Sequence, residues 1–195
     1  MRTRAWEGLW DMTMVITEMS VSVDGYIAGP DGDFSRGVPD EELHRFHNDQ
    51  VRPLGAHVLG RRLYETMSYW ETADDPDPVS QDFAAIWKAL PKLVFSRTLT
   101  NVEGTNTRLA TRGLATELEG LKANADGDIA IGGPTLAAEA VRLGLVDEHR
   151  LFLHPVAIGG GTSYFPHDHR VDLRLLETRV FDGPEVVYLR YGRRR

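Results

Sequence analysis

Four short segments of the sequence carry residues that are suited to binding phosphate groups. Each follows an apolar run that is typical of a strand. They are Gly60-Arg61-Arg62, Ser96-Arg97-Thr98, Gly132-Gly133-Pro134-Thr135 and Gly159-Gly160-Gly161. Glycine lets the backbone approach a ligand closely, a helix N-terminus offers unpaired N–H groups, and arginine forms charge-assisted hydrogen bonds to phosphate. One such segment alone is explained as well by a helix cap or a surface arginine, but four together favour a ligand with a pyrophosphate and a further phosphate.

The elements that would position these segments alternate between strand and helix. The apolar patterns predict strands over 14–23, 56–60, 92–96, 128–133 and 148–158, helices over 39–50, 61–67, 81–90, 111–123 and 134–144, and a hairpin of 171–181 with 185–192. This alternation predicts an α/β layer fold with a largely parallel sheet, and the hairpin predicts an antiparallel edge. Since such sheets bind ligands at the carboxyl ends of their strands, the four segments should share one edge.

A long turn-rich segment, Asp24–Phe34, follows the first predicted strand; we call it the opening loop. It holds two Asp-Gly pairs and one Gly-Pro pair. A plain hairpin needs only one Asp-Gly turn, and loops of this length in compact domains are more often lids or binding loops. The sequence therefore predicts a cover over the ligand.

The composition limits the classes of protein to which the chain can belong. Its 195 residues, 42% hydrophobic and 26% charged, fit one domain with a sizeable core. A net charge of −7 without a basic stripe argues against nucleic-acid binding, and no apolar run reaches the length of a membrane span. The absence of cysteine excludes disulfides and suits a reducing cytoplasm. We expect residues 1–13 to be an N-terminal extension, which can be disordered, and residues 14–192 to be a single domain.

Several common motifs are absent from the sequence. The glycine segments lack the G-x-G-x-x-G pattern of a dinucleotide-binding Rossmann unit, and no Gly-Lys-Ser/Thr of a P-loop occurs. The pairs His44/His47 and His167/His169 lack an identifiable third ligand, so no metal site is expected.

The order of the motifs resembles the dihydrofolate reductase-like superfamily. The resemblance rests on SVDGYIAG, HVLGRRLYETM, LVFSRTL and IAIGGPTLAAEAVRLGLVDEHRLFLHPVAIGGGTSYFP, and it covers residues 14–191. The chain is most similar to the branch related to the C-terminal reductase domain of the bifunctional riboflavin-biosynthesis deaminase/reductase. This resemblance implies a three-layer fold with a twisted, mostly parallel eight-stranded sheet, NADPH as cofactor, and a homodimer.

The resemblance also assigns roles to the four segments. It implies that a set of nine residues binds the cofactor: Gly60, Arg61 and Arg62 at phosphates, Ser96 and Arg97 at the adenosine end, and Gly132, Gly133, Thr135 and Leu136 at the pyrophosphate and nicotinamide. The opening loop matches a mobile lid. Leu63 stands where folate reductases commonly have threonine, so one phosphate-binding hydroxyl is missing.

Two acids are candidates for catalysis and substrate binding. By resemblance, Glu42 takes the place of a carboxylate on the first helix, and Asp24 lies near a ribosyl substrate. His154 would contact the substrate beside Glu42. Each has a plainer interpretation: Glu42 as an acid favoured by the helix dipole, Asp24 as a turn residue, and His154 as a structural histidine. Water remains an alternative proton source.

The resemblance implies hydride transfer to a C=N or C=O carbon of a small molecule. The substrate would be a pterin, a pyrimidine or a ribosyl-carbonyl compound, as for 5-amino-6-(5-phosphoribosylamino)uracil reductase. The alternative is an NADP(H)-binding protein without turnover, either a sensor or an inactive paralogue. Fold alone does not choose between them.

Overall fold

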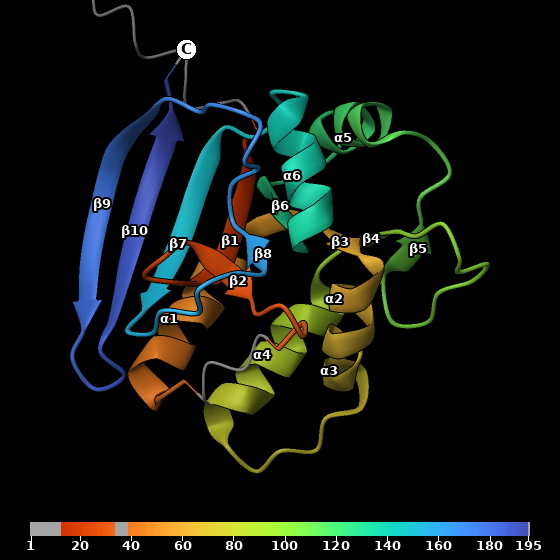
Figure 1. Cartoon of the computed structure of the whole chain (residues 1–195). Helices are drawn as coiled ribbons and strands as arrows, with labels where there is room; N and C mark the ends of the chain where they lie inside the picture. The colour runs from red at the N-terminus through yellow and green to blue at the C-terminus, as the bar shows by residue number, and fades with distance from the viewer. Residues whose placement is uncertain (1–12, 34–38, 195) are drawn as a thin grey trace, which may run out of the picture.

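An eight-stranded sheet forms the middle layer of the protein (Figure 1). The computed structural model describes residues 13–33 and 39–194. The strand order is β5-β4-β3-β6-β1-β7-β10-β9. The six parallel strands are β1 (Val15–Ser22), β3 (Leu54–Gly60), β4 (Lys92–Phe95), β5 (Thr107–Leu109), β6 (Asp128–Gly132) and β7 (Glu148–His154). The hairpin of β9 (Leu173–Phe181) and β10 (Val186–Arg193) is antiparallel and pairs with β7.

Helices cover both faces of this sheet. Figure 1 shows α5 (Leu114–Lys122) and α6 (Pro134–Arg142) in front of it, and α1 (Glu41–Val51) and α4 (Pro78–Ala89) behind it. The short helices α2 (Arg61–Met67) and α3 (Tyr69–Thr72) follow β3 and pack on the α4 side. This arrangement confirms the predicted three-layer fold with a mostly parallel sheet and a C-terminal antiparallel hairpin.

Alternate side chains of β1 face opposite layers, as the pleat of a strand requires. Val15 packs in the core cluster that includes α5 and α6. Ile16 packs on the other face, with Leu90 and Ala130. The even-numbered side chains of β1 that follow Ile16 therefore face the layer of α1 and α4.

A second, two-stranded sheet lies at the carboxyl ends of β1 and β7 (Figure 1). It pairs β2 (Tyr26–Ala28) of the opening loop with β8 (Thr162–Ser163). Gly161, just before β8, has φ +113°, and a Cβ there would lie 2.2 Å from the carbonyl oxygen of Ala28. Only glycine fits this close approach.

Most element boundaries lie within two residues of the sequence patterns, but α4 begins three residues earlier and α5 three residues later than predicted. Two other differences have a clear local reason. Helix α1 begins at Glu41 rather than Pro39, because the Asp40 side chain caps it by accepting a hydrogen bond from the Leu43 N–H at 2.8 Å. Strand β7 ends at His154 rather than residue 158, since Pro155 has no N–H to donate to a ladder. The predicted extension of residues 1–13 lies, except for its last residue, outside the described residues.

No helix in the described ranges is long and apolar enough to cross a membrane.

Candidate functional site

The starts of α2 and α6 lie against each other at the carboxyl edge of the sheet. Strands β3 and β6 are paired, with Leu59 opposite Gly132. Gly133 has φ +95°, and a Cβ there would lie 3.5 Å from the Gly60 nitrogen. Gly60 itself has an ordinary φ of −72°, and a Cβ on it would meet only van der Waals contacts at 3.8 Å and beyond. The backbone does not require glycine at position 60, so its small size leaves room for a ligand.

The segment after β4 lies beside the starts of α2 and α6. Gly60 lies opposite Phe95, so Arg61 and Ser96 leave neighbouring strands at the same level. The Ser96 hydroxyl accepts hydrogen bonds from the N–H groups of Thr98 at 3.1 Å and Leu99 at 2.9 Å, which shapes a tight turn. Three of the four phosphate-binding segments predicted from the sequence are therefore neighbours.

The arginines of these segments are available to a ligand. Arg61 forms an exposed ion pair with Glu65 at 3.1 Å, a contact that contributes little stability and that a phosphate can replace. Arg62 and Arg97 are exposed and form no ion pair with any residue in the described ranges. This side of the site is thus cationic at neutral pH.

The remaining predicted cofactor residues differ in their exposure. Thr135 is exposed at the start of α6. Leu136 is 8% exposed, and its side chain packs in the core. Its backbone N–H is therefore the group that remains to bind a ligand. A Cβ on Gly132 would lie 2.3 Å from Leu63 Cδ2 and 2.9 Å from His57 Nε2, so this glycine is needed for packing. Leu63, which replaces the expected hydroxyl, serves that packing.

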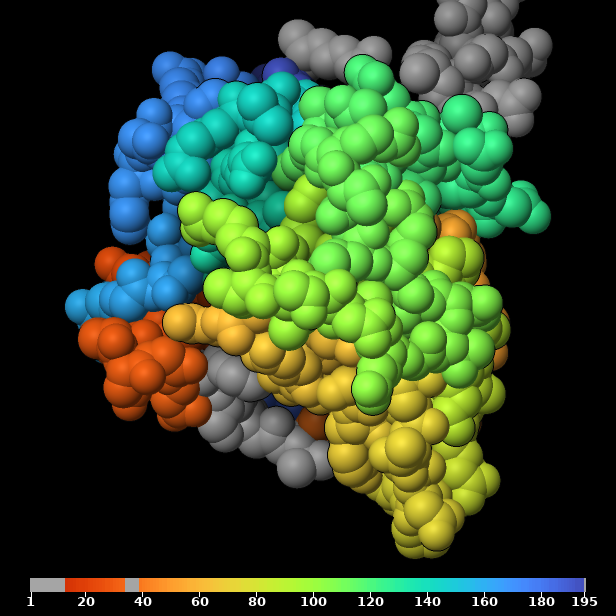
Figure 2. Space-filling model, turned by 90° about the vertical axis from the view of Figure 1, so that its right-hand side faces the viewer, coloured from red at the N-terminus to blue at the C-terminus, as the bar shows by residue number. Residues whose placement is uncertain are grey.

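The fourth glycine segment lies with the opening loop at the carboxyl ends of β1 and β7. In Figure 2 the opening loop (orange-red) and the segment before β8 (blue) lie together, next to the start of α2 (light orange). The Tyr164 N–H donates to the Gly25 carbonyl at 3.0 Å and extends the contact between the first two of these segments. That the opening loop covers a ligand stays a prediction.

Asp24 holds these segments together. Its carboxylate accepts hydrogen bonds from the Ser22 hydroxyl at 2.6 Å, from the Gly159 N–H at 2.7 Å and from the Ile158 N–H at 3.1 Å. The Ser22 hydroxyl and these two N–H groups lower the pKa of Asp24 to about 2. An acid ionised at neutral pH has no proton to give, so this geometry favours a positioning role. Contact of Asp24 with a substrate stays a prediction.

Glu42 lies on the flank of α1 that faces β9. Its side chain is 58% exposed, and its carboxylate pairs with Arg179 at 2.7 Å. The Arg179 guanidinium lies over the rings of Phe46 and Phe181, 4.9 Å and 4.6 Å from their centroids. The structure does not bring Glu42 together with Asp24 or His154, and its predicted catalytic role stays a prediction.

His154 is at the carboxyl end of β7, on the face toward α1. Its Nε2 lies 3.2 Å from the Ser20 hydroxyl, which belongs to the neighbouring strand β1. Both side chains are half-buried near the end of the sheet. Their position agrees with a substrate contact, which stays a prediction for His154.

Sequence reasoning assigned no catalytic role to two titratable residues beneath this pair. Glu18 lies on the inner face of β1, and His47 of α1 places Nδ1 3.6 Å from a Glu18 oxygen. The Arg150 guanidinium approaches the other oxygen at 3.7 Å. No motif marks Glu18; the available signal was a single acid within an apolar strand pattern.

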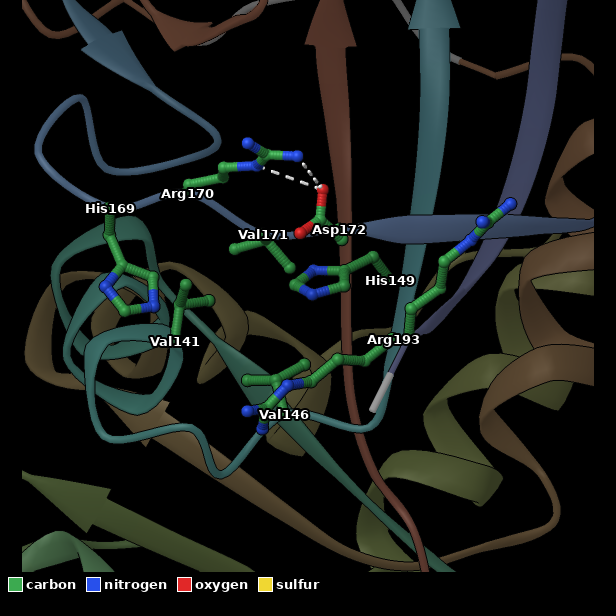
Figure 3. Close-up of a pocket in the computed structure, with 9 residues that line it drawn as sticks. Val141, Val146, His149, His169, Arg170, Val171, Asp172 and Arg193 are labelled. Carbon is green, nitrogen blue, oxygen red and sulfur yellow. Dashed lines mark hydrogen bonds and ion pairs between the residues drawn. The ribbon is translucent and has the colours of Figure 1, made fainter.

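Two hollows lie away from this edge. One, of about 180 Å³, lies beside α6 and is lined by His149, His169 and Arg193 among others (Figure 3). There His149 Nδ1 lies 3.0 Å from the Thr17 hydroxyl, which in turn is 2.7 Å from the Tyr164 hydroxyl. The other, of about 300 Å³, lies beside β4 and β5. The described residues hold no group of three or more His, Cys, Asp or Glu that could bind a metal ion.

Comparison with known proteins gives a family and a fold. The family model of the RibD C-terminal domain matches residues 13–188. The uncharacterized protein YyaP of Bacillus subtilis (strain 168) is 29% identical over 182 residues, which cover 89% of this chain and 93% of that protein. Among solved structures, a pyrimidine reductase-like protein from Corynebacterium diphtheriae NCTC has a TM-score of 0.67 at 17% identity, covering 94% of this chain and 92% of that chain.

A folate enzyme is also similar in structure. Dihydrofolate reductase from Enterococcus faecalis, complexed with NADP(H), has a TM-score of 0.63 at 17% identity, covering 93% of this chain and 97% of that chain. At this level of identity the likeness shows the dihydrofolate reductase-like fold. Together with the family model, these relatives support a reductase-type function.

Proposed function

The chain belongs to the RibD C-terminal domain family, and on this premise we propose that it is an NADPH-dependent reductase of a small heterocyclic or ribosyl-carbonyl compound. The observation that carries the proposal is the group formed by Gly60, Gly133 and the exposed Arg62 and Arg97 at one edge of the sheet. The lack of a side chain at Gly60, beside the start of α2, suits a pyrophosphate, and an arginine suits the 2′-phosphate that distinguishes NADPH from NADH.

The bound cofactor would supply a hydride from its nicotinamide ring. The residues of this chain would do the rest. Gly60, Gly133 and the arginines would hold the phosphates. The opening loop, fixed by Asp24, would cover the reacting atoms and exclude water, while Ser20 and His154 would contact the substrate at the carboxyl ends of β1 and β7.

The family offers two substrate classes that both fit the proposal. Reduction of a C=N bond in a pterin and reduction of a ribosylamino-pyrimidine at its sugar carbon each need one hydride and one proton. Purified protein should therefore be mixed with NADPH and either dihydrofolate or 5-amino-6-(5-phosphoribosylamino)uracil. Loss of nicotinamide absorbance that depends on one of these compounds supports the proposal, and NADH serves as the control cofactor.

A second candidate is NADP(H) binding without turnover. The ionised state of Asp24 and the ion pair of Glu42 with Arg179 favour it, because neither acid is placed to give a proton. Nicotinamide fluorescence separates the possibilities. NADPH binding without turnover on either compound or on related heterocycles indicates the second function, whereas absence of NADPH binding contradicts both. The homodimer and the cytoplasmic location stay predictions.

A further inference from the structure

The Glu18 side chain is half-buried and receives no hydrogen bond from the described residues. Its side chain is 16% exposed, yet neither oxygen accepts a hydrogen bond from the part of the chain that the structure describes. The ion pairs at 3.6 Å and 3.7 Å are longer than hydrogen bonds. Buried carboxylates normally accept several hydrogen bonds, so this one has capacity left for another group.

Arg150 does not fill that capacity, because other side chains hold it. Its Nε donates to Glu148 at 2.8 Å, and its Nη1 donates to the Gln50 side-chain oxygen at 3.1 Å. Tyr188 also donates to that Gln50 oxygen, at 3.4 Å. Arg150 is thus fixed as a nearby positive charge and leaves Glu18 oriented toward α1.

His47 faces Glu18 with one ring nitrogen and leaves the other unengaged. Its ring packs on Phe152, with centroids 4.0 Å apart, which fixes the imidazole plane. Nδ1 faces Glu18, while Nε2 makes no hydrogen bond with the described residues. The side chain is 27% exposed, so solvent reaches it. A carboxylate on one nitrogen and an open second nitrogen are the features of an imidazole that can hold and pass a proton.

The position of the pair suits the proposed reaction. Glu18 lies on the same face of β1 as Ser20, two residues nearer the start of the strand. Ser20 contacts His154 at the carboxyl end of the sheet. His47 is one helical turn along α1 from Leu43, which packs inward on the same helix. By contrast, Glu42 points to the opposite flank of α1, toward Arg179. The pair thus lies beneath the predicted substrate contacts.

We propose that His47 donates the proton for the reduction and that Glu18 is the positioning residue that holds its imidazolium form. This inference rests on the proposed function. The bound cofactor would supply the hydride for a new C–H bond at the C=N or C=O carbon of the substrate, and the π electron pair of that bond would move to the nitrogen or oxygen. That atom takes the proton from His47 Nε2. The imidazole becomes neutral and regains a proton from water, so atoms and charges balance.

Other titratable groups lie near Glu18 and His47 and can influence how the activity depends on pH. His57 of β3 lies near Glu18 on one side, and burial lowers the pKa of His57 to about 4, which keeps it neutral. Arg150 approaches from β7, and Tyr188 of β10 lies beyond it. Burial raises the pKa of Tyr188, so its hydroxyl stays protonated. Of this set, His47 is the histidine that faces Glu18 and is also reached by solvent.

The test compares His47→Gln and Glu18→Gln with two controls, Glu41→Gln and His167→Gln, whose side chains are exposed. The substrate is whichever of dihydrofolate and 5-amino-6-(5-phosphoribosylamino)uracil the native protein reduces. We expect kcat to fall about 10²–10⁴-fold in His47→Gln, with NADPH affinity unchanged. If His47 donates the proton, turnover falls as the pH rises and the imidazolium loses that proton. In Glu18→Gln this fall should begin at a lower pH, because the carboxylate beside the imidazolium is gone.

A second readout does not depend on turnover. The ¹⁵N signals of the His47 ring should move in Glu18→Gln and stay in place in Glu41→Gln, and thermal unfolding checks that each variant is folded. Native turnover in both variants, or loss of turnover in Glu42→Gln alone, overturns the proposal and leaves the reductase function intact. If Glu18→Gln does not fold, the turnover of His47→Gln alone tests the proposal. Absence of turnover by the native protein, with any compound, contradicts the function itself.

Discussion

The Asp24 carboxylate accepts a hydrogen bond from the Gly159 N–H at 2.7 Å, and this contact joins the end of β1 to the segment after β7. Asp24 and Gly159 are 135 residues apart in the chain. The opening loop begins at Asp24. The hydrogen bonds that this carboxylate accepts therefore hold the start of the loop in place.

Asp24→Asn should weaken the attachment of the opening loop and remove one pH dependence. The pKa of Asp24 is lowered from 3.8 to about 2 in the folded protein. Its stabilising effect is therefore complete above the unfolded pKa of 3.8 and is lost as the pH falls toward about 2. Urea unfolding between about pH 5 and about pH 2.5 should show a smaller decrease in stability for Asp24→Asn than for the native protein. Asp31→Asn, in an exposed turn, is the control, and an unaltered pH dependence in Asp24→Asn contradicts this assignment.

Gly161→Ala should separate β2 from β8. The new Cβ would overlap the Ala28 carbonyl, and the residue would keep a φ of +113°. Such backbone strain costs on the order of 1–3 kcal/mol. We expect faster amide exchange at the Tyr164 N–H, which bonds to Gly25, and a higher KM for the substrate. Gly159→Ala shares the positive φ, but its Cβ has no neighbour within 4 Å, so it controls for strain alone. Equal exchange rates in the two variants would count against the steric explanation.

Arg97→Ala should weaken NADPH binding and leave NADH binding nearly unchanged. A hydrogen bond from a charged group to a phosphate contributes about 1.5–3 kcal/mol, which corresponds to roughly 10–150-fold in Kd. Titration by nicotinamide fluorescence measures both cofactors. Arg45→Ala is the matched control, since Arg45 pairs with Glu41 on the surface of α1. If native protein binds NADPH and NADH equally well, the role of Arg97 at the 2′-phosphate is wrong.

The buried histidines should make the protein less stable below neutral pH. Burial lowers the pKa of His149 to about 4, from an unfolded value of 6.5. A histidine with a lowered folded pKa stays neutral while the unfolded chain takes up a proton, so stability falls as the pH drops from 6.5 toward 4. For one such histidine the loss between about pH 7 and about pH 5 is about 2 kcal/mol. His149→Gln should show less of this loss in urea unfolding than His167→Gln, in which only an exposed histidine is replaced. The same loss in both variants would rule out His149 as its source.

The exposed apolar side chains of β9 are consistent with the predicted homodimer. This strand lies at the edge of the sheet, and Leu175 and Val180 on it are 53% and 61% exposed. Unpaired edges of this kind are normally covered or charged. Light scattering should give about twice the 21.8 kDa of one chain at micromolar concentration. Val180→Asp should shift the protein toward the monomer, with Asp49→Asn on α1 as the control. A native monomer contradicts the prediction.

The long elements were predictable because their patterns are local. Helix α2 has the bounds that its sequence indicates, and β1 differs by one residue at each end. Strands β2, β5 and β8 were missed. They are two or three residues long, so no period within them could mark a strand. In addition, β2 and β8 pair with each other from distant parts of the chain. Helix α3, four residues long, was missed for the same reason.

The site was predictable to a smaller degree. The glycine and arginine segments could be found because strand ends of a parallel sheet meet at one edge. Glu18 and His47 could not, since a side chain on a strand and one on a helix meet through packing of Phe46 and Phe152 that no spacing records. The flank of α1 on which Glu42 lies was equally hidden, because a shift of one residue turns a helix by about 100°.

The two sides of the predicted site are built by different stretches of chain. Segments after β3, β4 and β6 form the side with the arginines, whereas the opening loop and the segment before β8 form the other. Asp24 and Gly161 fix the second side through contacts within that side. Under the proposed function, substitutions on the second side would change which electron acceptor fits, without altering the segments that would hold the electron donor.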